Sequence, residues 1–477
     1  METFQYIILY IGTVICVAHV YDLTYRFQIK EYRLDRFLSF LKEEGFINAV
    51  YTRQIRFPSA SLRNMLIIAL SVLLLIGVIF YAQEGSFIRL MAFVVLAPIA
   101  SLTVVTVSVL LTEVLAQIRR RKIVREAKAH LSLSKAVVIG ITGSYGKTTT
   151  KEFLAQILGS RFKVAKTEAN MNTDVGIALS ILKDVTPETQ YFIVEMGAYT
   201  RGEIEKACRL VLPKYGILTA IGNQHLSLFG SREKLLAAKK ELLEAVPVKG
   251  RIYMSKTIKD RSVLVRGIMA PVTLFSSGTK GDITARKVAG KKSSYTVVYK
   301  KKSFDIEVPK ELPYAIDAIL PGVALALDLG MSLKEIQAGV KGIKILPAKL
   351  SQSKGIKGST LLLDTANSSV EGFISAVDAL GAIKATGQKY AVSKGVIELG
   401  EEKEASYQKI LSKLSKNKVS LLTTDRLFKA LDVSNNVSLF EEEKKLLAHL
   451  LEKINKKTTI LLEGRFTPSF IQKLQAQ

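Results

Sequence analysis

One stretch of this 477-residue chain combines the residue types that bind phosphate. Residues 137–150 read VVIGITGSYGKTTT, in which a β-branched apolar run is followed by Gly143, Gly146, Lys147 and Thr148. A glycine loop lets backbone N–H groups approach phosphate closely, and the next helix N-terminus adds positive potential. The Lys supplies a cation, and the Thr hydroxyl supplies a Mg²⁺ ligand. The pattern therefore predicts a strand, a phosphate-binding loop and a helix.

The loop departs at one position from the common pattern G-x-x-x-x-G-K-[ST]. Ile141 stands where the first glycine of that pattern falls, so the match is to the variant T-G-x-x-G-K-T-T. An ordinary glycine-rich turn is the alternative, but the order of strand, Gly, Lys, Thr and helix favours a phosphate loop. The candidate nucleotide-binding residues here are Gly143, Ser144, Tyr145, Gly146, Lys147, Thr148 and Thr149.

Three further candidates follow predicted elements downstream. Glu195 ends the apolar run YFIVE, and a carboxylate that leaves a buried strand beside a phosphate loop is placed to bind Mg²⁺. A helix-capping acid is the alternative for Glu195, and a structural loop histidine is the alternative for His225, which follows the next predicted strand. Lys239 lies in the helical segment REKLLAAKKELLEAV, where a lysine is normally solvated.

Composition limits the classes of partner. The 68 Lys and Arg against 42 Asp and Glu give a formal charge of +26, which suits an anionic membrane surface, an anionic substrate or nucleic acid. The sequence has no basic patch interleaved with aromatic residues and no nucleic-acid-binding motif, so a nucleic-acid partner is not expected. Cys16 and Cys208 provide neither a disulfide framework nor a CxxC metal site.

The first 130 residues contain three long apolar segments, at 4–21, 65–82 and 87–115. Each is long enough, or nearly so, to span a bilayer as a helix. The first segment has no preceding basic residue and no following small-residue cleavage site, which argues against a signal peptide. Buried helices of a soluble domain are the alternative. We therefore expect a transmembrane region of three helices at residues 1–130.

The distribution of positive charge predicts the orientation of these spans. Eight Lys or Arg residues lie between the first and second spans, only QEGS joins the second and third, and IRRRKIVREAK follows the third. The positive-inside rule then places the basic loop and everything after Arg119 in the cytoplasm, and the N-terminus outside. Three spans without an internal charge pair offer no pathway for a substrate, so a transporter is not favoured.

Four motifs appear in the order TGSYGKTTTKE, NMNTDVG, VEMGAYTRGEI and HLSLFGSREKLLAAKKEL. Together they resemble the central domain of the ATP-dependent Mur ligases, most closely the MurF branch. The resemblance implies that Lys147 and Thr148 hold ATP and Mg²⁺, and that Glu195 and His225 serve the metals. Asn172 of the second motif joins the candidate nucleotide-binding residues.

The same resemblance changes the interpretation of Lys239 from a solvated residue to a catalytic one, because the matching lysine of the family is carbamylated. A carbamate turns an ammonium group into an anion that can bind Mg²⁺, a cation that prefers oxygen ligands. The implied metal-binding residues are therefore Thr148, Glu195, His225 and carbamylated Lys239.

The last 130 residues alternate predicted strands and helices, which indicates a second α/β domain. It resembles the C-terminal Mur ligase domain, in which Asp364 matches the Asp that meets the nucleotide ribose and Asn367 matches its neighbour. Ala348-Lys349 stands where the family has Gly-Arg, whose Arg reaches the γ-phosphate. Lys349 would meet that phosphate with a single ammonium group, without the paired hydrogen bonds of a guanidinium. Ala366 replaces the Tyr of the D-x-Y-N pattern.

Two other segments depart from the family. The apolar helical segment LPYAIDAILPGVALALDLG stands where the family carries a His and Asn pattern beside the nucleotide, and only Asp317 lies near the place of the final Asn. The tripeptide EGR at 463–465 stands where the MurF branch has Lys-Gly-Ser.

The expected architecture is α/β, with a phosphate-loop central domain of Mur ligase type at 131–346, a Rossmann-like C-terminal domain at 347–477 and the membrane region before them. The expected activity is that of a membrane-anchored ligase: ATP phosphorylates a carboxylate, an amine attacks the acyl phosphate, and ADP and phosphate leave. The implied partners are the membrane, a UDP-linked or lipid-linked cell-wall precursor, and an amino acid or dipeptide. The alternative is a degenerate ligase that serves as an ATP-binding membrane scaffold in cell-wall synthesis.

Overall fold

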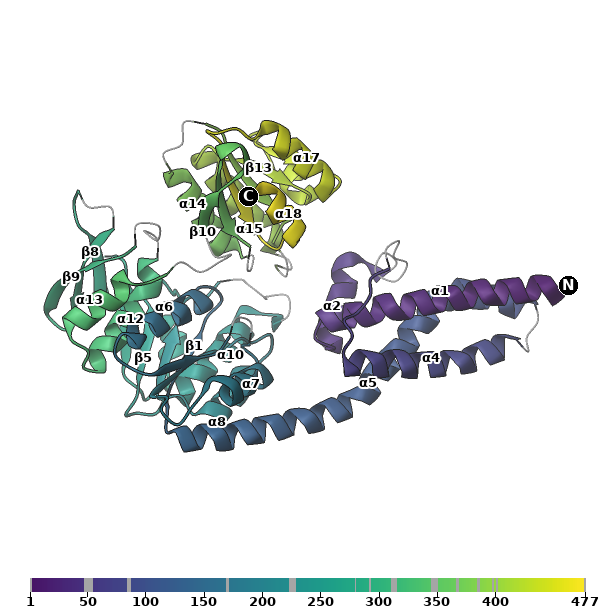
Figure 1. The fold of residues 1–477 in the computed structure, drawn as a ribbon, viewed down its shortest axis with the longest axis horizontal. Coiled ribbons are helices and arrows are strands. Elements are labelled where there is room, and N and C mark those ends of the chain that lie inside the picture. The colour runs from purple at the N-terminus through teal and green to yellow at the C-terminus, as the bar shows by residue number, and fades with distance from the viewer. Residues whose placement is uncertain are drawn as a thin grey trace. The chain divides into compact units, whose positions relative to one another are not determined.

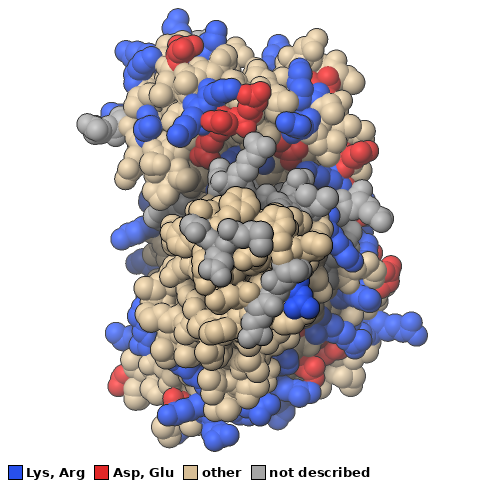
Figure 2. Space-filling model, turned by 90° about the vertical axis from the view of Figure 1, so that its right-hand side faces the viewer, with Lys and Arg blue, Asp and Glu red and all other residues tan. Residues whose placement is uncertain are grey.

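A computed structural model describes residues 2–46, 55–83, 87–168, 171–222, 229–278, 280–290, 293–309, 315–344, 351–365, 369–383, 387–396, 399 and 402–475. The chain divides into two compact units, Met1–Ile123 and Val124–Gln477. Figure 1 labels their helices and strands. In Figure 2 the blue Lys and Arg side chains predominate over the red Asp and Glu, as the formal charge of +26 leads us to expect.

The first unit is helical. Its elements are α1 (Glu2–Ile29), α2 (Leu34–Glu44), α4 (Leu62–Gln83) and the first part of α5 (Phe87–Ser134). The segments Phe4–Ile29, Leu62–Gln83 and Phe87–Ser134 are helices long and apolar enough to cross a membrane. A helix satisfies its backbone polar groups internally, as a bilayer requires. The three expected apolar segments are therefore helices of spanning length.

Small polar side chains mark where these helices pack together. The Cys16 thiol lies 3.7 Å from the carbonyl oxygen of Ala97, and the Ser101 hydroxyl donates to the carbonyl of Cys16 at 3.3 Å. Ser71 donates to the hydroxyl of Ser108 at 3.0 Å. Small residues allow close helix approach, and hydrogen bonds between hydroxyls join apolar helices where no water is available.

The second unit contains a nine-stranded sheet in the order β2-β3-β1-β4-β5-β6-β7-β8-β9. The parallel strands are β1 (Val137–Thr142), β2 (Val164–Lys166), β3 (Tyr191–Glu195), β4 (Tyr215–Leu218), β5 (Arg251–Ser255), β6 (Val272–Ser276) and β7 (Ile283–Lys287). A hairpin of β8 (Ser294–Tyr299) and β9 (Lys302–Glu307) extends the sheet antiparallel. Strand β1 lies between β3 and β4, where the strand order reverses. In parallel sheets of this kind, ligands bind beside the carboxyl ends of the strands at the point of reversal.

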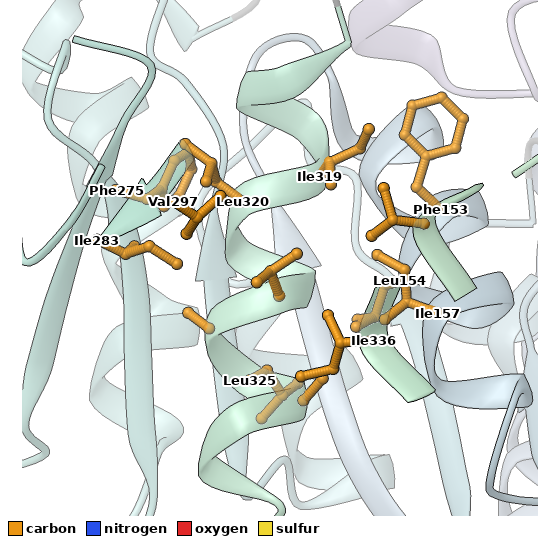
Figure 3. Close-up of a cluster of buried hydrophobic side chains, with 14 of the residues drawn as sticks. Phe153, Leu154, Ile157, Phe275, Ile283, Val297, Ile319, Leu320, Leu325 and Ile336 are labelled. Atoms are coloured by element: carbon orange, nitrogen blue, oxygen red, sulfur yellow. The ribbon is translucent and has the colours of Figure 1, made fainter. Parts of the chain in front are cut away.

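Helices connect and cover these strands. They are α6 (Lys147–Gly159), α7 (Asp174–Asp184), α8 (Glu203–Val211), α10 (Arg232–Ala245), α11 (Arg261–Val265), α12 (Ile316–Asp328) and α13 (Leu333–Lys341). Figure 3 shows side chains of α12 lying between those of the sheet and those of α6. The labelled members of this core are Phe153, Leu154, Ile157, Phe275, Ile283, Val297, Ile319, Leu320, Leu325 and Ile336.

A second sheet has the order β10-β11-β15-β12-β13-β14. Its strands are β10 (Ser351–Lys354), β11 (Thr360–Asp364), β12 (Lys389–Ser393), β13 (Ser420–Thr423), β14 (Val437–Leu439) and β15 (Thr459–Glu463), all parallel except β10. Its helices are α14 (Val370–Ala382), α15 (Lys403–Lys416), α16 (Arg426–Ala430), α17 (Glu443–Lys453) and α18 (Pro468–Leu474). This confirms the expected second α/β fold. The predicted domain boundaries stay predictions.

The α12 core gives a stability prediction. Leu320 is 0% exposed, so Leu320→Ala leaves a cavity and should lower the free energy of unfolding by about 2–5 kcal/mol. Urea unfolding followed by circular dichroism measures this change. Met269→Ala is the control, because Met269 is 76% exposed and its truncation should cost no more than about 0.5 kcal/mol. Equal losses in both variants would contradict the assigned core.

Candidate active site

The carboxyl end of β1 leads directly into the glycine loop. Gly143 has a φ of +149° and Gly146 a φ of +80°, values that side chains rarely adopt. A Cβ on Gly143 would lie only 2.1 Å from Thr219 Oγ1, at the end of β4. The backbone N–H of Ser144 donates to the carbonyl of Ala220 at 2.8 Å. The loop is thus packed closely against the chain that follows β4.

The loop ends at the N-terminus of α6. Gly146 is the N-cap, and the next three residues are Lys147, Thr148 and Thr149, so the free N–H groups of the first helical turn border the loop. The Lys147 ammonium donates to the carbonyls of Gly143 at 2.8 Å and Ser144 at 3.3 Å. Burial lowers its pKa, although nearby Glu195 acts in the opposite direction. These donors and this cation suit a polyphosphate.

Glu195 is the last residue of β3 and is 3% exposed. Its Oε1 accepts a hydrogen bond from Asn172 Nδ2 at 3.3 Å. Its Oε2 is buried without a hydrogen-bond partner among the described residues, with Lys151 Nζ 3.4 Å away. A buried carboxylate oxygen without a hydrogen bond is suited to bind a metal cation, because Mg²⁺ prefers oxygen ligands and a buried charge needs compensation.

Neighbouring groups keep this carboxylate ionised. Burial alone raises the pKa of Glu195. The ammonium groups of Lys147 and Lys151 lower this pKa, as do hydrogen bonds from the Thr148 hydroxyl and the Asn172 amide, and the net effect is a lowered pKa. The acid is therefore charged at neutral pH.

Lys239 is buried in α10, with 3% of its surface exposed. Its Nζ lies 5.9 Å from the centre of the Phe229 ring, and no hydrogen bond or ion pair joins it to any residue that the structure describes. Burial, then repulsion from Lys147, lowers the pKa of Lys239 to about 7, even though Glu203 and Glu241 raise it. A substantial neutral fraction at neutral pH distinguishes Lys239 from a solvated lysine.

The two glutamates near Lys239 hold the loop that follows Glu195. Glu241 accepts hydrogen bonds from the backbone N–H groups of Gly202 at 2.6 Å and Glu205 at 2.9 Å, at the start of α8. Glu203 accepts from Tyr199 N–H at 2.6 Å. Neither glutamate was predicted as a site residue; Glu203, in the first turn of α8, carried the common capping signal, whereas Glu241, inside α10, carried none.

Lys151 is a third residue at this site for which the sequence predicted no role. It is 0% exposed, and its ammonium donates to the carbonyls of Thr167 at 2.6 Å and Glu168 at 3.3 Å while lying 3.4 Å from Glu195. It therefore joins α6 and the end of β2 to the carboxylate of β3. Its position four residues after Lys147 places the two lysines on the same helix face, but nothing in the local sequence indicates that Lys151 is buried.

The structure brings together some of the predicted site residues. Lys147, Thr148, Asn172 and Glu195 gather at the carboxyl ends of β1 and β3, and Lys239 interacts electrostatically with Lys147. Tyr145 accepts a hydrogen bond at its carbonyl from Thr219 at 2.6 Å. The described residues contain no group of three His, Cys, Asp or Glu side chains that would hold a metal.

The structure describes only some of the remaining predicted residues. His225, Lys349 and Asn367 lie outside the described residues. Asp364 ends β11 of the second sheet, in register with Glu463 of β15. Asp317 accepts hydrogen bonds from Ser277 N at 2.9 Å and Ser277 Oγ at 3.0 Å. Asp317 therefore fixes the turn after β6.

The contacts of Lys151 predict a large stability effect. Lys151→Met removes the cation beside buried Glu195 and the hydrogen bonds that Lys151 donates to two carbonyls, so we expect the free energy of unfolding to fall by about 3 kcal/mol. Thermal and urea unfolding measure the loss. Lys183→Met is the matched control, because Lys183 pairs with Glu168 at the exposed surface, where an ion pair contributes little to stability. A Lys151→Met protein as stable as this control would contradict the buried contact.

Comparison with known proteins relates this geometry to a family. Residues 141–312 match the Mur ligase middle domain. The UDP-N-acetylmuramoyl-tripeptide–D-alanyl-D-alanine ligase of Bacillus subtilis is 27% identical over 328 residues, 69% of this chain and 70% of that protein. The Escherichia coli ligase of the same name is 29% identical over 281 residues, 58% of this chain and 61% of that protein. The matches thus span roughly two thirds of these relatives.

Solved structures show the same fold. The MurF ligase of Thermotoga maritima in complex with ADP superposes with a TM-score of 0.64 at 24% identity, covering 74% of this chain and 82% of that chain. The predictions of a Mur ligase fold and of relatedness to ATP-dependent ligases are therefore confirmed. The chain carries a Mur ligase middle domain and is a homologue of the UDP-N-acetylmuramoyl-tripeptide–D-alanyl-D-alanine ligases, as its four motifs predict.

Proposed function

We propose that the chain is a membrane-anchored, ATP-dependent ligase that joins a carboxylate to an amine through an acyl phosphate. The observation that carries the proposal is the arrangement at the ends of β1 and β3: a glycine loop with Lys147, ionised Glu195 and buried Lys239. The names of the relatives favour a peptidoglycan-type precursor and an amino acid or dipeptide as substrates, and the T. maritima complex favours an adenine nucleotide.

The chain's own residues would position and neutralise the nucleotide phosphates. The loop N–H groups and the first turn of α6 hold them, and Lys147 leaves the carbonyls of Gly143 and Ser144 to neutralise the γ-phosphoryl group as it moves. Mg²⁺ would be held by Thr148, Glu195, His225 and modified Lys239, and it supplies further positive charge at the phosphates. Asn172 orients the Glu195 carboxylate.

The proposed reaction has two bond exchanges. A carboxylate oxygen of the precursor attacks the γ-phosphorus of ATP, the bond to the β–γ bridging oxygen breaks, and ADP leaves. The amine then attacks the carbonyl carbon of the acyl phosphate, phosphate departs with the C–O bonding electrons, and the amine loses a proton. Water must be excluded between the two steps, because it would hydrolyse the acyl phosphate.

The electrostatics of Lys239 support its carbamylation. A neutral amine is the form that attacks CO₂, and burial beside Lys147 holds the pKa of Lys239 at about 7. When the N–C bond forms and a proton leaves, the resulting anion replaces repulsion between two buried cations with attraction. The site would thus hold the carbamate more readily than the ammonium.

We further propose that the precursor is met at the cytoplasmic face of the membrane, because three spanning-length helices precede the ATP-binding region. Asp364, and Lys349 in place of the family's Arg, would contact the nucleotide from the C-terminal domain. The departures at Lys349, Ala366 and 463–465 favour a second candidate, an ATP-binding scaffold without catalysis. Glu195 and Lys239 favour the enzyme, since a scaffold has little need of a buried lysine with a lowered pKa.

Phosphate release tests the ligase. The full chain in lipid nanodiscs, given ATP, Mg²⁺, UDP-N-acetylmuramoyl-tripeptide and D-alanyl-D-alanine, should release phosphate, and Lys147→Ala should slow release about 1,000-fold. Lys183→Ala, which changes an exposed lysine, should leave the rate unchanged. If the chain binds ATP but releases no phosphate with any soluble or lipid-linked precursor and amine, the result would instead support the scaffold.

Carbamylation has a separate readout and pH dependence. With ¹³C-bicarbonate, a carbamate resonance should grow as the pH rises through about 7, because Lys239 then loses its proton, and it should fade below that pH. Lys239→Arg should abolish the resonance. Lys240→Arg should retain it, because Lys240 lies 3.4 Å from Glu244 as an ordinary ion pair. A resonance that persists in Lys239→Arg would overturn the assignment.

A further inference from the structure

The turns that lead into four adjacent strands of the nine-stranded sheet expose apolar side chains. The strands β1, β4, β5 and β6 are parallel neighbours, so the turns before them meet at the amino edge of the sheet. Leu133, Leu212, Val248 and Met269 lie shortly before these strands and are 78%, 71%, 60% and 76% exposed. Large apolar side chains gathered on one exposed surface are typical of a contact with a partner or a membrane.

Hydrogen bonds and close packing hold these turns side by side. The backbone N–H of Lys214 donates to the carbonyl of Val138 at 2.9 Å, which ties the start of β4 to β1. A Cβ on Gly250 would lie only 2.0 Å from the carbonyl oxygen of Lys214, so the turns before β4 and β5 touch. Ile252 N–H donates to the carbonyl of Pro271 at 2.9 Å, which joins β5 to the turn before β6. The four turns therefore form one surface.

Each of the four turns also presents one basic side chain to solvent. These side chains are Lys135, Lys214, Lys249 and Arg266. Asp and Glu are absent from the turns, which comprise residues 133–136, 212–214, 247–250 and 266–271. The surface thus combines apolar and basic side chains. We call the four apolar residues and these four basic residues the amino-edge patch.

Two residues of the amino-edge patch occupy backbone conformations that the fold does not favour. Leu212 has a φ of +49° and Lys135 a φ of +56°, in the left-handed region where glycine is the usual residue after a helix. Leu212 also gains little burial at this position. A leucine that is both strained and exposed contributes little to folding, so contact with another surface accounts better for its presence.

The amino-edge patch lies at the end of the helix that begins as the third expected span. Helix α5 starts as an apolar segment able to cross a membrane and continues to Ser134, just before β1. Its last turns are fixed to the domain that follows, because Ala127 is buried and His130 Nε2 lies 2.8 Å from the carbonyl oxygen of Val185. A bilayer that holds the start of α5 is therefore tied to the patch by one continuous helix, which raises its effective concentration there.

We propose that the amino-edge patch docks on the anionic headgroups of the bilayer that anchors the chain. Lysine and arginine attract anionic lipid, and the apolar side chains beside them enter the headgroup region, so two weak signals combine. The part of α5 before the patch can lie along the same surface, because Arg121, Arg125 and Lys128 are exposed and share one helix face. The inference rests on the proposed membrane anchoring and not on ligation.

The chemistry of the amino-edge patch favours lipid over other anionic or apolar partners. The patch has no aromatic side chain on which a nucleic-acid base could stack. A second copy of this chain, with its formal charge of +26, would meet the patch with like charge. An anionic bilayer complements the charge and also accepts aliphatic side chains.

A single tryptophan can report contact with lipid, because the sequence contains no Trp. The full chain carrying Val248→Trp would be placed in nanodiscs whose lipids are brominated on the acyl chains, made of phosphatidylcholine with or without phosphatidylglycerol. Bromine should quench the fluorescence strongly in the anionic discs and little in phosphatidylcholine alone. Val433→Trp is the control, because Val433 is 99% exposed and lies outside the patch, and it should stay unquenched in both.

Removal of charge in the Val248→Trp chain tests the basic side chains. Lys135→Gln, Lys214→Gln and Arg266→Gln together should lower the ratio of docked to undocked chains about 100-fold, since each basic residue near an anionic surface contributes about 5-fold. Exchange of the same residues as Lys135→Arg, Lys214→Arg and Arg266→Lys keeps the charges and should restore quenching, which excludes misfolding as the cause.

A second triple variant controls for net charge. Lys302→Gln, Lys334→Gln and Lys409→Gln remove three exposed lysines outside the amino-edge patch and should leave the quenching unchanged.

The outcomes separate the patch from the proposals beneath it. Co-elution of the chain with the discs reports anchoring, and a chain that stays outside the discs would overturn the anchoring and the patch together. Anchored chains whose Val248→Trp fluorescence is unquenched in anionic discs would overturn the patch alone. Equal quenching in phosphatidylcholine discs, or in the triple glutamine variant of the patch, would also overturn it. No ATP or ligase substrate is present, so loss of the ligase proposal would leave the result untouched.

Discussion

The burial of charge where β1 and β3 end is the constraint on which the candidate site depends. Lys151 is 0% exposed, and Glu195 and Lys239 are each 3% exposed. Charge in such a place is costly unless another charge or a hydrogen bond compensates it. Lys151 and Asn172 compensate Glu195 in part, whereas the ammonium of Lys239 has no compensating ion pair among the described residues. The proposed polyphosphate would compensate the cations, and the proposed metal ion would compensate the Glu195 oxygen that has no hydrogen bond.

The fold explains why these charges meet. Parallel strands deliver their last residues to one edge of the sheet, and the order β3-β1-β4 places the acid, the glycine loop and Thr219 side by side. The large core between the sheet, α6 and α12 lies along the same elements and holds them rigidly. Helix α6 thus contributes to both regions. Its Phe153 packs in the core, and its Lys151 lies among the buried charges at the carboxyl edge of the sheet.

Local signals made the phosphate loop predictable from sequence: β-branched residues before it, glycines at positive φ and a helix after it all act within one short segment. The alternating elements of the second sheet were predictable for the same reason. The role of Lys151 was not predictable, because contacts with the ends of β2 and β3 bury it. The local sequence of its own helix is polar at this position and gives no sign of that burial. Lys239 was identified only through resemblance, since no local pattern distinguishes a lysine that tertiary packing buries.

The contacts between the glycine loop and the chain after β4 have a mechanical consequence. Ser144 donates to the carbonyls of Ala220 and Gly222, and Thr219 donates to the carbonyl of Tyr145. The space beside Gly143 is filled by the same Thr219 hydroxyl. A shift of the glycine loop as phosphate enters must therefore either move Thr219, Ala220 and Gly222 with it or break these hydrogen bonds.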